Sequence, residues 1–403
     1  MLSKKEWERH CFGEKNQRCT SRPVPIDKDC RLVLYGAGYG GLMFLELLRS
    51  QGIEPECILD ISPQKYGREI MGVPVYSPDT MDLNERIAII CLLKMGEAYQ
   101  QIKEKLMSMG CQAVFHLYEL RGNQALFKDQ PLVISPDLDL IWDHRDSLYS
   151  TYIMLEDALS RQTLSAVLRF LWGNLYEPVP ALPMEDQYFA DDIYSLEGNE
   201  VFVDCGAHVG EIMLQFFRRT HGQFKNYWAF EPDRSNVQAL KEKCPGEFHQ
   251  KSIIYDLALG NRPDRVQIHN YDGSNSVIHA NGETEAVCVE LDSFKDILYP
   301  TILKIDVEGW ESRLLTGAKG IICRDKPVIA IAVYHKEHDL WEIPLQLKQW
   351  VPEYCLYIRS YLNVAETVLY AVPPERAKKR RTHHEISHLT WGEKTIQDRS
   401  GSK

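Results

Sequence analysis

Two stretches of the chain alternate short apolar runs with amphipathic segments. The first extends over 31–125 and the second over 201–373. In the first stretch, the apolar runs predicted as strands lie at 31–35, 57–60, 87–91 and 113–117, and helical periodicity lies at 41–51 and 97–108. Strands that alternate with helices are typical of doubly wound sheets. We therefore predict an α/β protein with two Rossmann-like domains.

The second stretch contains more predicted strands than a minimal nucleotide-binding fold. Beyond the strands that end at Asp204 and Glu231, the runs predicted as strands lie at 253–259, 266–269 (a hairpin), 286–291, 301–306, 327–334, 354–359 and 367–371. The near-continuous apolar run 328–333 indicates a central strand that is buried on both faces. The close spacing of the last two runs predicts an antiparallel final pair.

Three segments lie outside these stretches. Residues 1–30 are polar and are predicted to be an irregular lead-in. Residues 137–200 show mostly helical periodicity, broken by the proline-rich run 178–183, and are predicted to join the two domains. Residues 374–403 are polar and are predicted to be a disordered tail.

Composition narrows the class of protein. With 403 residues, two domains are expected, and a net charge of −11 argues against a nucleic-acid partner. The eleven cysteines contain no Cys-x-x-Cys pair, which indicates free thiols in a reducing compartment. The N-terminus lacks a signal-peptide pattern, and no apolar run approaches membrane-spanning length. We expect a cytoplasmic protein without a membrane partner; its oligomeric state stays open.

The most informative motif is the turn that follows Asp204. A predicted strand ends at that acid, helical periodicity begins at Glu211, and Glu231 ends the next strand 21 residues after Gly210. The small residues of the turn are Gly206, Ala207 and Gly210. Strand, turn, helix, strand and acid form a nucleoside-binding unit in which the second acid binds ribose hydroxyls.

The chemistry of this turn favours one cofactor. The turn lacks the full Gly-x-Gly-x-x-Gly pattern, and Asp204 would repel a pyrophosphate. S-adenosylmethionine has no phosphate and carries a sulfonium and an ammonium group, so it suits an acid at this position. The motif thus indicates a methyltransferase; the alternative is an ordinary strand-to-helix turn. Asp256 follows the third strand and is either an adenine contact or part of a turn.

Candidate catalytic residues follow two later strands. Asp306 and Glu308 come directly after the apolar run 302–305, at the sheet edge where such folds bind ligands. They could orient a substrate hydroxyl or contribute to a carboxylate metal site, or they could cap the helix that follows. No dense Asp/Glu/His cluster is visible in the sequence, so we assign no metal.

His335 ends the apolar run 328–334 on the same edge of the sheet. An alcohol acceptor loses its proton during methyl transfer, and a histidine with a near-neutral pKa suits that task. We therefore predict His335 as the general base, with orientation of the substrate as the alternative role. Lys304 and Lys336 are predicted to be solvated.

Four motifs in order resemble the FkbM family of S-adenosylmethionine-dependent methyltransferases. They begin at Asp204, Phe230, Ile305 and Tyr334, and the resemblance covers roughly 150–373. It implies a class I methyltransferase fold and O-methylation of a sugar, glycan precursor or related small hydroxylated metabolite. The segments that begin at Asp157 and Gln187 resemble the helical lead-in of a longer subgroup. Tyr188 and Phe189 either cover the cofactor or form hydrophobic core between helix and sheet, and we favour the core. Arg359-Ser-Tyr361 departs from the family pattern, which has a histidine after the arginine.

The first domain carries its own glycine-rich turn. Gly36, Gly38 and Gly41 match the dinucleotide pattern, and Asp60 follows 19 residues after the last glycine. This turn follows a strand, opens a helix and contains no acid, so it could bind phosphate. We predict a nucleotide or nucleotide sugar there, ahead of NAD; the alternative is a docking domain without a ligand. Two other functions remain open for the whole chain: a noncatalytic nucleotide or S-adenosylmethionine sensor or scaffold, and a bifunctional enzyme whose N-terminal domain uses NAD or a nucleotide sugar.

Overall fold

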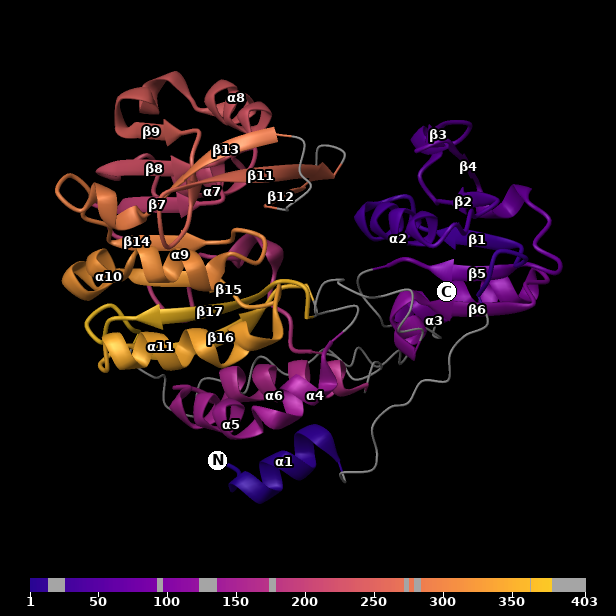
Figure 1. Ribbon diagram of the computed structural model, residues 1–403, viewed down its shortest axis with the longest axis horizontal. Helices are drawn as coiled ribbons and strands as arrows, with labels where there is room; N and C mark the ends of the chain where they lie inside the picture. The colour runs from indigo at the N-terminus through magenta and orange to yellow at the C-terminus, as the bar shows by residue number, and fades with distance from the viewer. Residues whose placement is uncertain are drawn as a thin grey trace, which may run out of the picture.

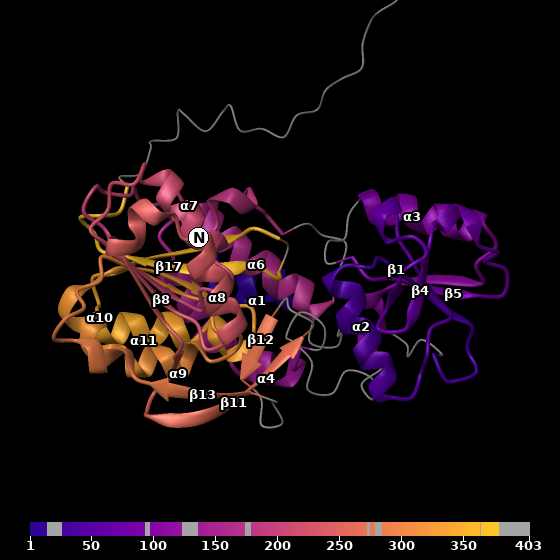
Figure 2. The ribbon, with the colours of Figure 1, turned by 90° about the horizontal axis from the view of Figure 1, so that it is seen from above.

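The computed structural model describes the chain in eight ranges, 1–13, 26–92, 97–122, 136–173, 179–271, 275–278, 284–362 and 364–378. The strands within these ranges form three sheets. Figure 1 and Figure 2 show the first sheet, from residues 31–122, as a body that stands apart from the other two. Helices α1 and α4–α6 lie beneath the larger body in Figure 1, although α1 is first in the chain.

The first sheet has six strands in the order β3-β4-β2-β1-β5-β6, and only the β3–β4 pair is antiparallel. Its elements are β1 Leu32–Tyr35, α2 Tyr39–Ser50, β2 Cys57–Leu59, β3 Glu69–Ile70, β4 Val73–Tyr76, β5 Ile87–Ile90, α3 Glu97–Ser108 and β6 Ala113–His116. The four strands and two helices expected here are confirmed. Strands β3 and β4 were not expected, because their short apolar segment is interrupted by Pro74.

The second sheet has seven strands in the order β16-β17-β15-β14-β7-β8-β9. They are β7 Val201–Cys205, β8 Asn226–Phe230, β9 Ser252–Tyr255, β14 Ile302–Ile305, β15 Val328–Ala332, β16 Cys355–Ser360 and β17 Thr367–Val372. The helices of this part are α7 Glu211–Arg219, α8 Arg234–Lys243, α9 Glu311–Gly317, α10 Lys319–Asp325 and α11 Glu342–Trp350. The sheet is parallel except for β17, which runs antiparallel between β15 and β16, so the expected antiparallel final pair is confirmed.

The strand order reverses between β7 and β14. From β7 the chain proceeds outward through β8 and β9, and then returns to place β14 on the other side of β7. In open α/β sheets, ligands bind at the carboxyl ends of the strands where the order reverses. A smaller sheet, of β10 Ala258–Leu259, β11 Asp264–Tyr271, β12 Asn275–Ile278 and β13 Thr284–Val289, follows β9 and includes the expected hairpin.

The joining segment is less helical than its periodicity indicates. Helices α4 Leu138–Asp143, α5 Arg145–Met154 and α6 Ala158–Trp172 are present, and α6 ends at Gly173, which has a φ of +115°. The described residues beyond it contain only a short 3-10 turn, Met184–Asp186, and run along the edge of the large sheet, where Ala181 bridges Ser360. The prediction of helix up to residue 200 is therefore wrong for 179–200, where apolar side chains pack against the sheet instead of following a helical period.

The start of the chain is not the irregular lead-in that its polarity suggests. Helix α1, Lys4–Phe12, begins with a capping box between Ser3 and Glu6. Its buried side chains, Trp7, Cys11 and Phe12, pack into the main core, and the Trp7 indole N–H donates to Ser165 of α6. Three buried residues in a polar stretch are enough to dock a short helix on an existing surface, and sequence polarity alone does not reveal that surface.

A buried arginine fastens the joining segment to the second sheet. Arg359 of β16 is 2% exposed, and its Nη2 lies 2.6 Å from carboxylate oxygens of both Asp157 and Asp192. Asp157 also caps α6 by accepting from the backbone N–H of Ser160. Burial acts to raise the pKa of Asp157, but its ion pair with Arg359 and its hydrogen bond with Ser160 hold that pKa below its usual value. Arg359, at the departure from the family pattern, thus has a structural role that does not require a neighbouring histidine.

Two general expectations concern the whole chain. Among the described residues, no helix combines the length and apolar character needed to cross a bilayer. The cysteines in these ranges are all free thiols. The part of the expected disordered tail from 379 to 403 lies outside the described residues.

Candidate active site

A cavity of about 400 Å³ opens at the carboxyl ends of the central strands of the second sheet. It lies at the reversal of strand order, and its volume suits a small ligand. The residues that line it are Gln187, Tyr188, Gly206, Ala207, His208, Glu211, Ile212, Phe230, Glu231, Pro232, Asn236, Leu257, Ala258, Leu259, Lys304, Asp306, Val307, Glu308, Tyr334 and Glu366. The candidate residues Gly206, Ala207, Glu231, Asp306 and Glu308 are therefore brought together, as the sequence predicts.

The turn after β7 depends on a glycine. Gly206 has a φ of +80°, and a Cβ atom there would lie 1.9 Å from the backbone oxygen of Asp306. A side chain would thus force apart the ends of β7 and β14. Gly210 caps α7 at the end of the turn and does not line the cavity.

Glu231 lies at the tip of β8 on the floor of the cavity. It is 4% exposed, and its Oε2 accepts a hydrogen bond of 2.8 Å from the backbone N–H of His208. Its Oε1 accepts from the backbone N–H of Asp233 at 3.0 Å. Burial raises the pKa of Glu231. The carboxylate therefore connects the turn to the end of β8 and lies where a ligand in the cavity can contact it.

Asp204 does not face the cavity, contrary to the expected direct contact with the cofactor. It is fully buried, 3.0 Å from Lys304 Nζ, and it accepts a 2.7 Å hydrogen bond from the hydroxyl of Tyr227. The prediction that Lys304 is solvated is also wrong, because its side chain is only 3% exposed and Nζ also donates to the backbone oxygen of Gly206. Burial opposes the charge of Lys304, but the carboxylates of Asp204 and Asp306 raise its pKa, so it stays protonated. Lys336 is exposed, as expected.

One side of the cavity is apolar. Phe230, Ile212 and the backbone run 257–259 form this side, next to Glu231. Asp256, a candidate adenine contact, is exposed and does not line the cavity; its two neighbours on the C-terminal side do. A flat aromatic base next to a ribose held at Glu231 would fit this surface.

The opposite end of the cavity is acidic. Asp306 and Glu308 line it, and Asp306 Oδ2 accepts a 2.8 Å hydrogen bond from the hydroxyl of Tyr188. Tyr188 is buried, as expected of a core residue, but its hydroxyl belongs to the site. Glu308 has a φ of +52°, a strained conformation for a residue with a side chain, and such strain concentrates at functional sites. Glu366 completes this end, where burial and the charge of Asp306 raise its pKa to about 7.

His335 lies behind the acidic end, not in the lining of the cavity. Its Nδ1 is 2.9 Å from Glu311 Oε1, while its Nε2 is 3.3 Å from Glu308 Oε2 and 3.8 Å from Asp306 Oδ1. Burial acts to lower the pKa of His335, but Glu311 and Glu308 raise it well above its usual value. The expectation of a near-neutral pKa is therefore wrong, because the carboxylates of Glu311 and Glu308 stabilise the imidazolium.

Glu311 is the site residue that sequence reasoning did not assign a role. It is the first residue of α9, is 0% exposed, and its Oε1 also accepts from the backbone N–H of Val307. Its Oε2 has no hydrogen-bond partner, and neither has Asp306 Oδ1. Its spacing from Asp306 and Glu308 gave the available signal, since an acid at the first position of the helix that follows a strand lies close to the end of that strand.

The glycine-rich turn of the N-terminal part is organised in a similar way. Gly36 has a φ of +110°, and Gly38 precedes α2. Asp60 Oδ2 accepts a 2.7 Å hydrogen bond from the backbone N–H of Ala37 and lies 3.1 Å from Lys65 Nζ. A Cβ atom on Gly41 would lie 1.9 Å from the backbone oxygen of Gly36. These contacts account for Gly36 and Gly41 structurally but not for Gly38, where a Cβ atom would meet nothing within 4 Å. A nucleotide at this turn stays a prediction.

Comparisons with known proteins agree with this geometry. Residues 204–365 match the family described as the methyltransferase FkbM domain. The structure resembles the methyltransferase FkbM of Methylobacillus flagellatus KT, with 24% identity, a TM-score of 0.66, and coverage of 85% of this chain and 89% of that chain. A sequence comparison with curated proteins gives no match.

Two other solved structures share smaller parts. Fibrillarin of Aeropyrum pernix, solved with bound S-adenosyl-L-methionine, is 10% identical over 44% of this chain and 69% of that chain, with a TM-score of 0.27. The UDP-D-quinovosamine 4-dehydrogenase of Vibrio fischeri is 18% identical over 21% of this chain and 76% of that chain, with a TM-score of 0.19. The family match covers most of the residues that line the cavity, and it is a match to a methyltransferase domain.

The Lys304–Asp204 pair generates a stability prediction. Lys304→Met removes the cation and leaves a buried carboxylate without its partner, so we expect a loss of about 3–5 kcal/mol in the free energy of unfolding, measured by urea denaturation. The double variant that adds Asp204→Asn should lose less than the sum of the two single variants. A Lys304→Met protein as stable as wild type would show that the pair does not support the site.

Proposed function

We propose that the cavity binds S-adenosylmethionine and that the domain transfers its methyl group to a hydroxyl of a small polyhydroxylated or glycan-type acceptor. The observation that carries the proposal is the acidic cavity beside Glu231. Five carboxylates line it, namely Glu211, Glu231, Asp306, Glu308 and Glu366. The basic residues of the lining are already paired, Lys304 with Asp204 and His208 with Glu211. Such a surface favours a cofactor with a sulfonium and an ammonium group over one with phosphates.

Each part of the cofactor has a matching surface. The ribose hydroxyls donate to Glu231, whose position at the tip of β8 is the usual one for this contact. The adenine lies on the apolar side formed by Phe230 and residues 257–259. The methionine part extends along the turn at Gly206 and Ala207, where the short side chains leave the backbone open. This path directs the sulfonium methyl toward Asp306 and Glu308.

The acceptor hydroxyl is held at the acidic end. Methyl transfer is an in-line displacement in which the hydroxyl oxygen attacks the methyl carbon, the carbon–sulfur bond breaks, and the hydroxyl proton leaves. Glu311 and Glu308 raise the pKa of His335 and favour its protonated form, so we do not assign it the role of base that the sequence suggested. We assign proton acceptance to Glu308, which lines the cavity with a side chain that is 29% exposed. Asp306, fixed by Tyr188, orients the hydroxyl.

The choice of acceptor rests on the shape and charge of the site. Carboxylates accept hydrogen bonds from several hydroxyl groups at once, which suits a sugar or a related polyol. The chain's net charge of −11 and the acidic cavity both disfavour a nucleic-acid acceptor. The proposed acceptor is thus a small molecule or a glycan precursor.

Cofactor binding is tested at Glu231. Glu231→Gln keeps the size of the side chain but removes its charge and one acceptor, so affinity for S-adenosylmethionine should fall by about 10- to 100-fold in titration calorimetry. The matched control is Gly38→Asp in the N-terminal part, where a Cβ atom meets nothing within 4 Å, and it should bind like wild type. Equal affinity in wild type and Glu231→Gln would remove the proposed ribose contact.

Proton acceptance is tested at Glu308. Glu308→Gln should lower the rate of methyl transfer by roughly two to four orders of magnitude, the range for loss of a general base, with cofactor affinity unchanged. The measurement follows label from methyl-tritiated S-adenosylmethionine into a panel of sugars and polyhydroxylated metabolites. Near-normal turnover by the variant would exclude Glu308 as the base. Failure of every hydroxylated compound to accept label would contradict the proposed acceptor class.

A further inference from the structure

The group behind the acidic end has the composition of a metal site. Ligand atoms of Asp306, Glu311 and His335 all lie within 4.8 Å of one another. These residues come from three elements, the end of β14, the start of α9 and the end of β15. Two carboxylates and an imidazole are common ligands of divalent cations such as Mn²⁺.

Buried oxygens in this group lack partners. Glu311 is 0% exposed, and its Oε2 accepts no hydrogen bond, while its Oε1 is held by Val307 and His335. Asp306 Oδ1 is also buried without a donor, and it lies 3.8 Å from His335 Nε2. A buried carboxylate oxygen without a donor is costly, and coordination to a cation would satisfy it.

The net charge of Asp306, Glu308, Glu311 and His335 also favours a bound cation. Three carboxylates, those of Asp306, Glu308 and Glu311, lie within 4 Å of the single imidazole of His335. Lys304 is near Asp306 but is paired with Asp204. Even a fully charged imidazole leaves two negative charges in a space that is largely shielded from water, and such a surplus attracts a multivalent cation.

We infer that Asp306, Glu311 and His335 bind a divalent cation at the acceptor end of the cavity. The imidazole gives up a proton to solvent as it becomes a ligand. Asp306 lines the cavity, so an oxygen of the acceptor can complete the coordination shell from that side. Glu308 remains beside it to take the proton of the acceptor. Cation binding stands independently of the proposed function, whereas this contact with the acceptor rests on it.

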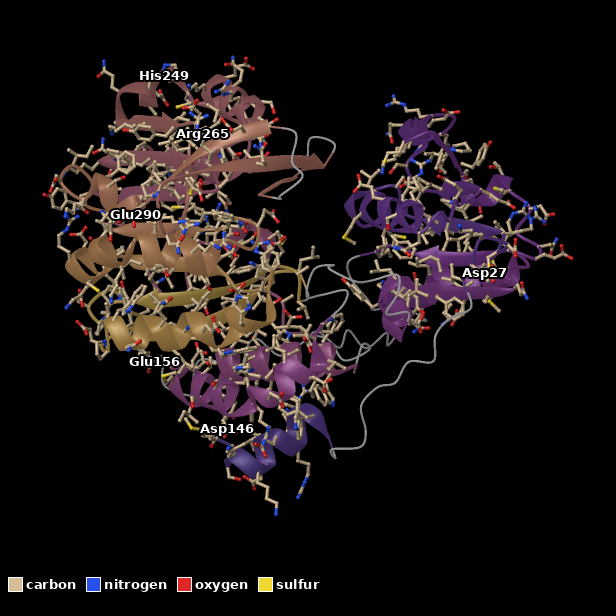
Figure 3. The ribbon with its side chains drawn as sticks, in the orientation of Figure 1. Asp27, Asp146, Glu156, His249, Arg265 and Glu290 are labelled. Carbon is tan, nitrogen blue, oxygen red and sulfur yellow. The ribbon has the colours of Figure 1, made fainter. Side chains whose placement is uncertain are left out.

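The test is a titration of the full-length, chelator-treated protein with MnCl₂, followed by the electron paramagnetic resonance signal of free Mn²⁺. Wild type should bind one Mn²⁺ per chain. Glu311→Gln and Asp306→Asn should each bind it at least about tenfold more weakly, because each loses a charged ligand. The matched control is Glu290→Gln, an acid of the same domain outside the trio and labelled in Figure 3, which should bind like wild type.

Thermal melts of the same samples separate ligand loss from misfolding. At one fixed concentration, Mn²⁺ should raise the melting temperature of wild type and of Glu290→Gln, and it should raise that of Asp306→Asn, whose side chain is 22% exposed, by clearly less. Absence of bound Mn²⁺ in wild type, or equal affinity in all four proteins, would overturn the inference. Calorimetry with S-adenosylmethionine on the chelated protein distinguishes the two proposals. If the protein binds the cofactor but does not bind Mn²⁺ in the titration, only the cation site is overturned. If it binds Mn²⁺ but does not bind the cofactor, only the proposed function is overturned.

Discussion

The site depends on the close approach of two adjacent strand ends. Strands β7 and β14 lie side by side, and Gly206 brings the first so near to Asp306 that no side chain would fit between them. The buried Lys304–Asp204 pair lies beneath this contact, and Lys304 also holds the backbone of the turn. One small constraint thus positions both the turn at Gly206 and the acidic end of the cavity.

The charged groups of the site have different roles. Asp204 and Lys304 neutralise each other, and Lys304 also donates a hydrogen bond to the backbone of the turn. The carboxylates that face the cavity are those at the strand tips and next to them. His335 lies behind them and offsets part of their charge. The acidic end of the cavity can therefore keep several carboxylates close together, as a polyhydroxylated acceptor or a cation would require.

The sequence predicts the strands, the turn and the acids at the strand tips, because each is a local pattern. It does not predict that Lys304 is buried in an ion pair, since its partner Asp204 lies 100 residues earlier and contacts it only because the two strands pair. The prediction of a near-neutral pKa for His335 is wrong for the same reason, because Glu311 contacts the imidazole from another element, 24 residues away. Helix α1 was missed because the surface that buries Trp7 is built by α6. Local residue patterns carry the fold, whereas charge states depend on contacts between distant segments.

The most direct test of the central claim is a crystal structure of the protein with S-adenosylhomocysteine, the product of methyl transfer. The account predicts ribose hydroxyls on Glu231, adenine against Phe230 and residues 257–259, and sulfur directed toward Asp306 and Glu308. Density for the ligand at the glycine-rich turn of Gly36–Gly41, or in the cavity with its sulfur directed away from the acidic end, would contradict it.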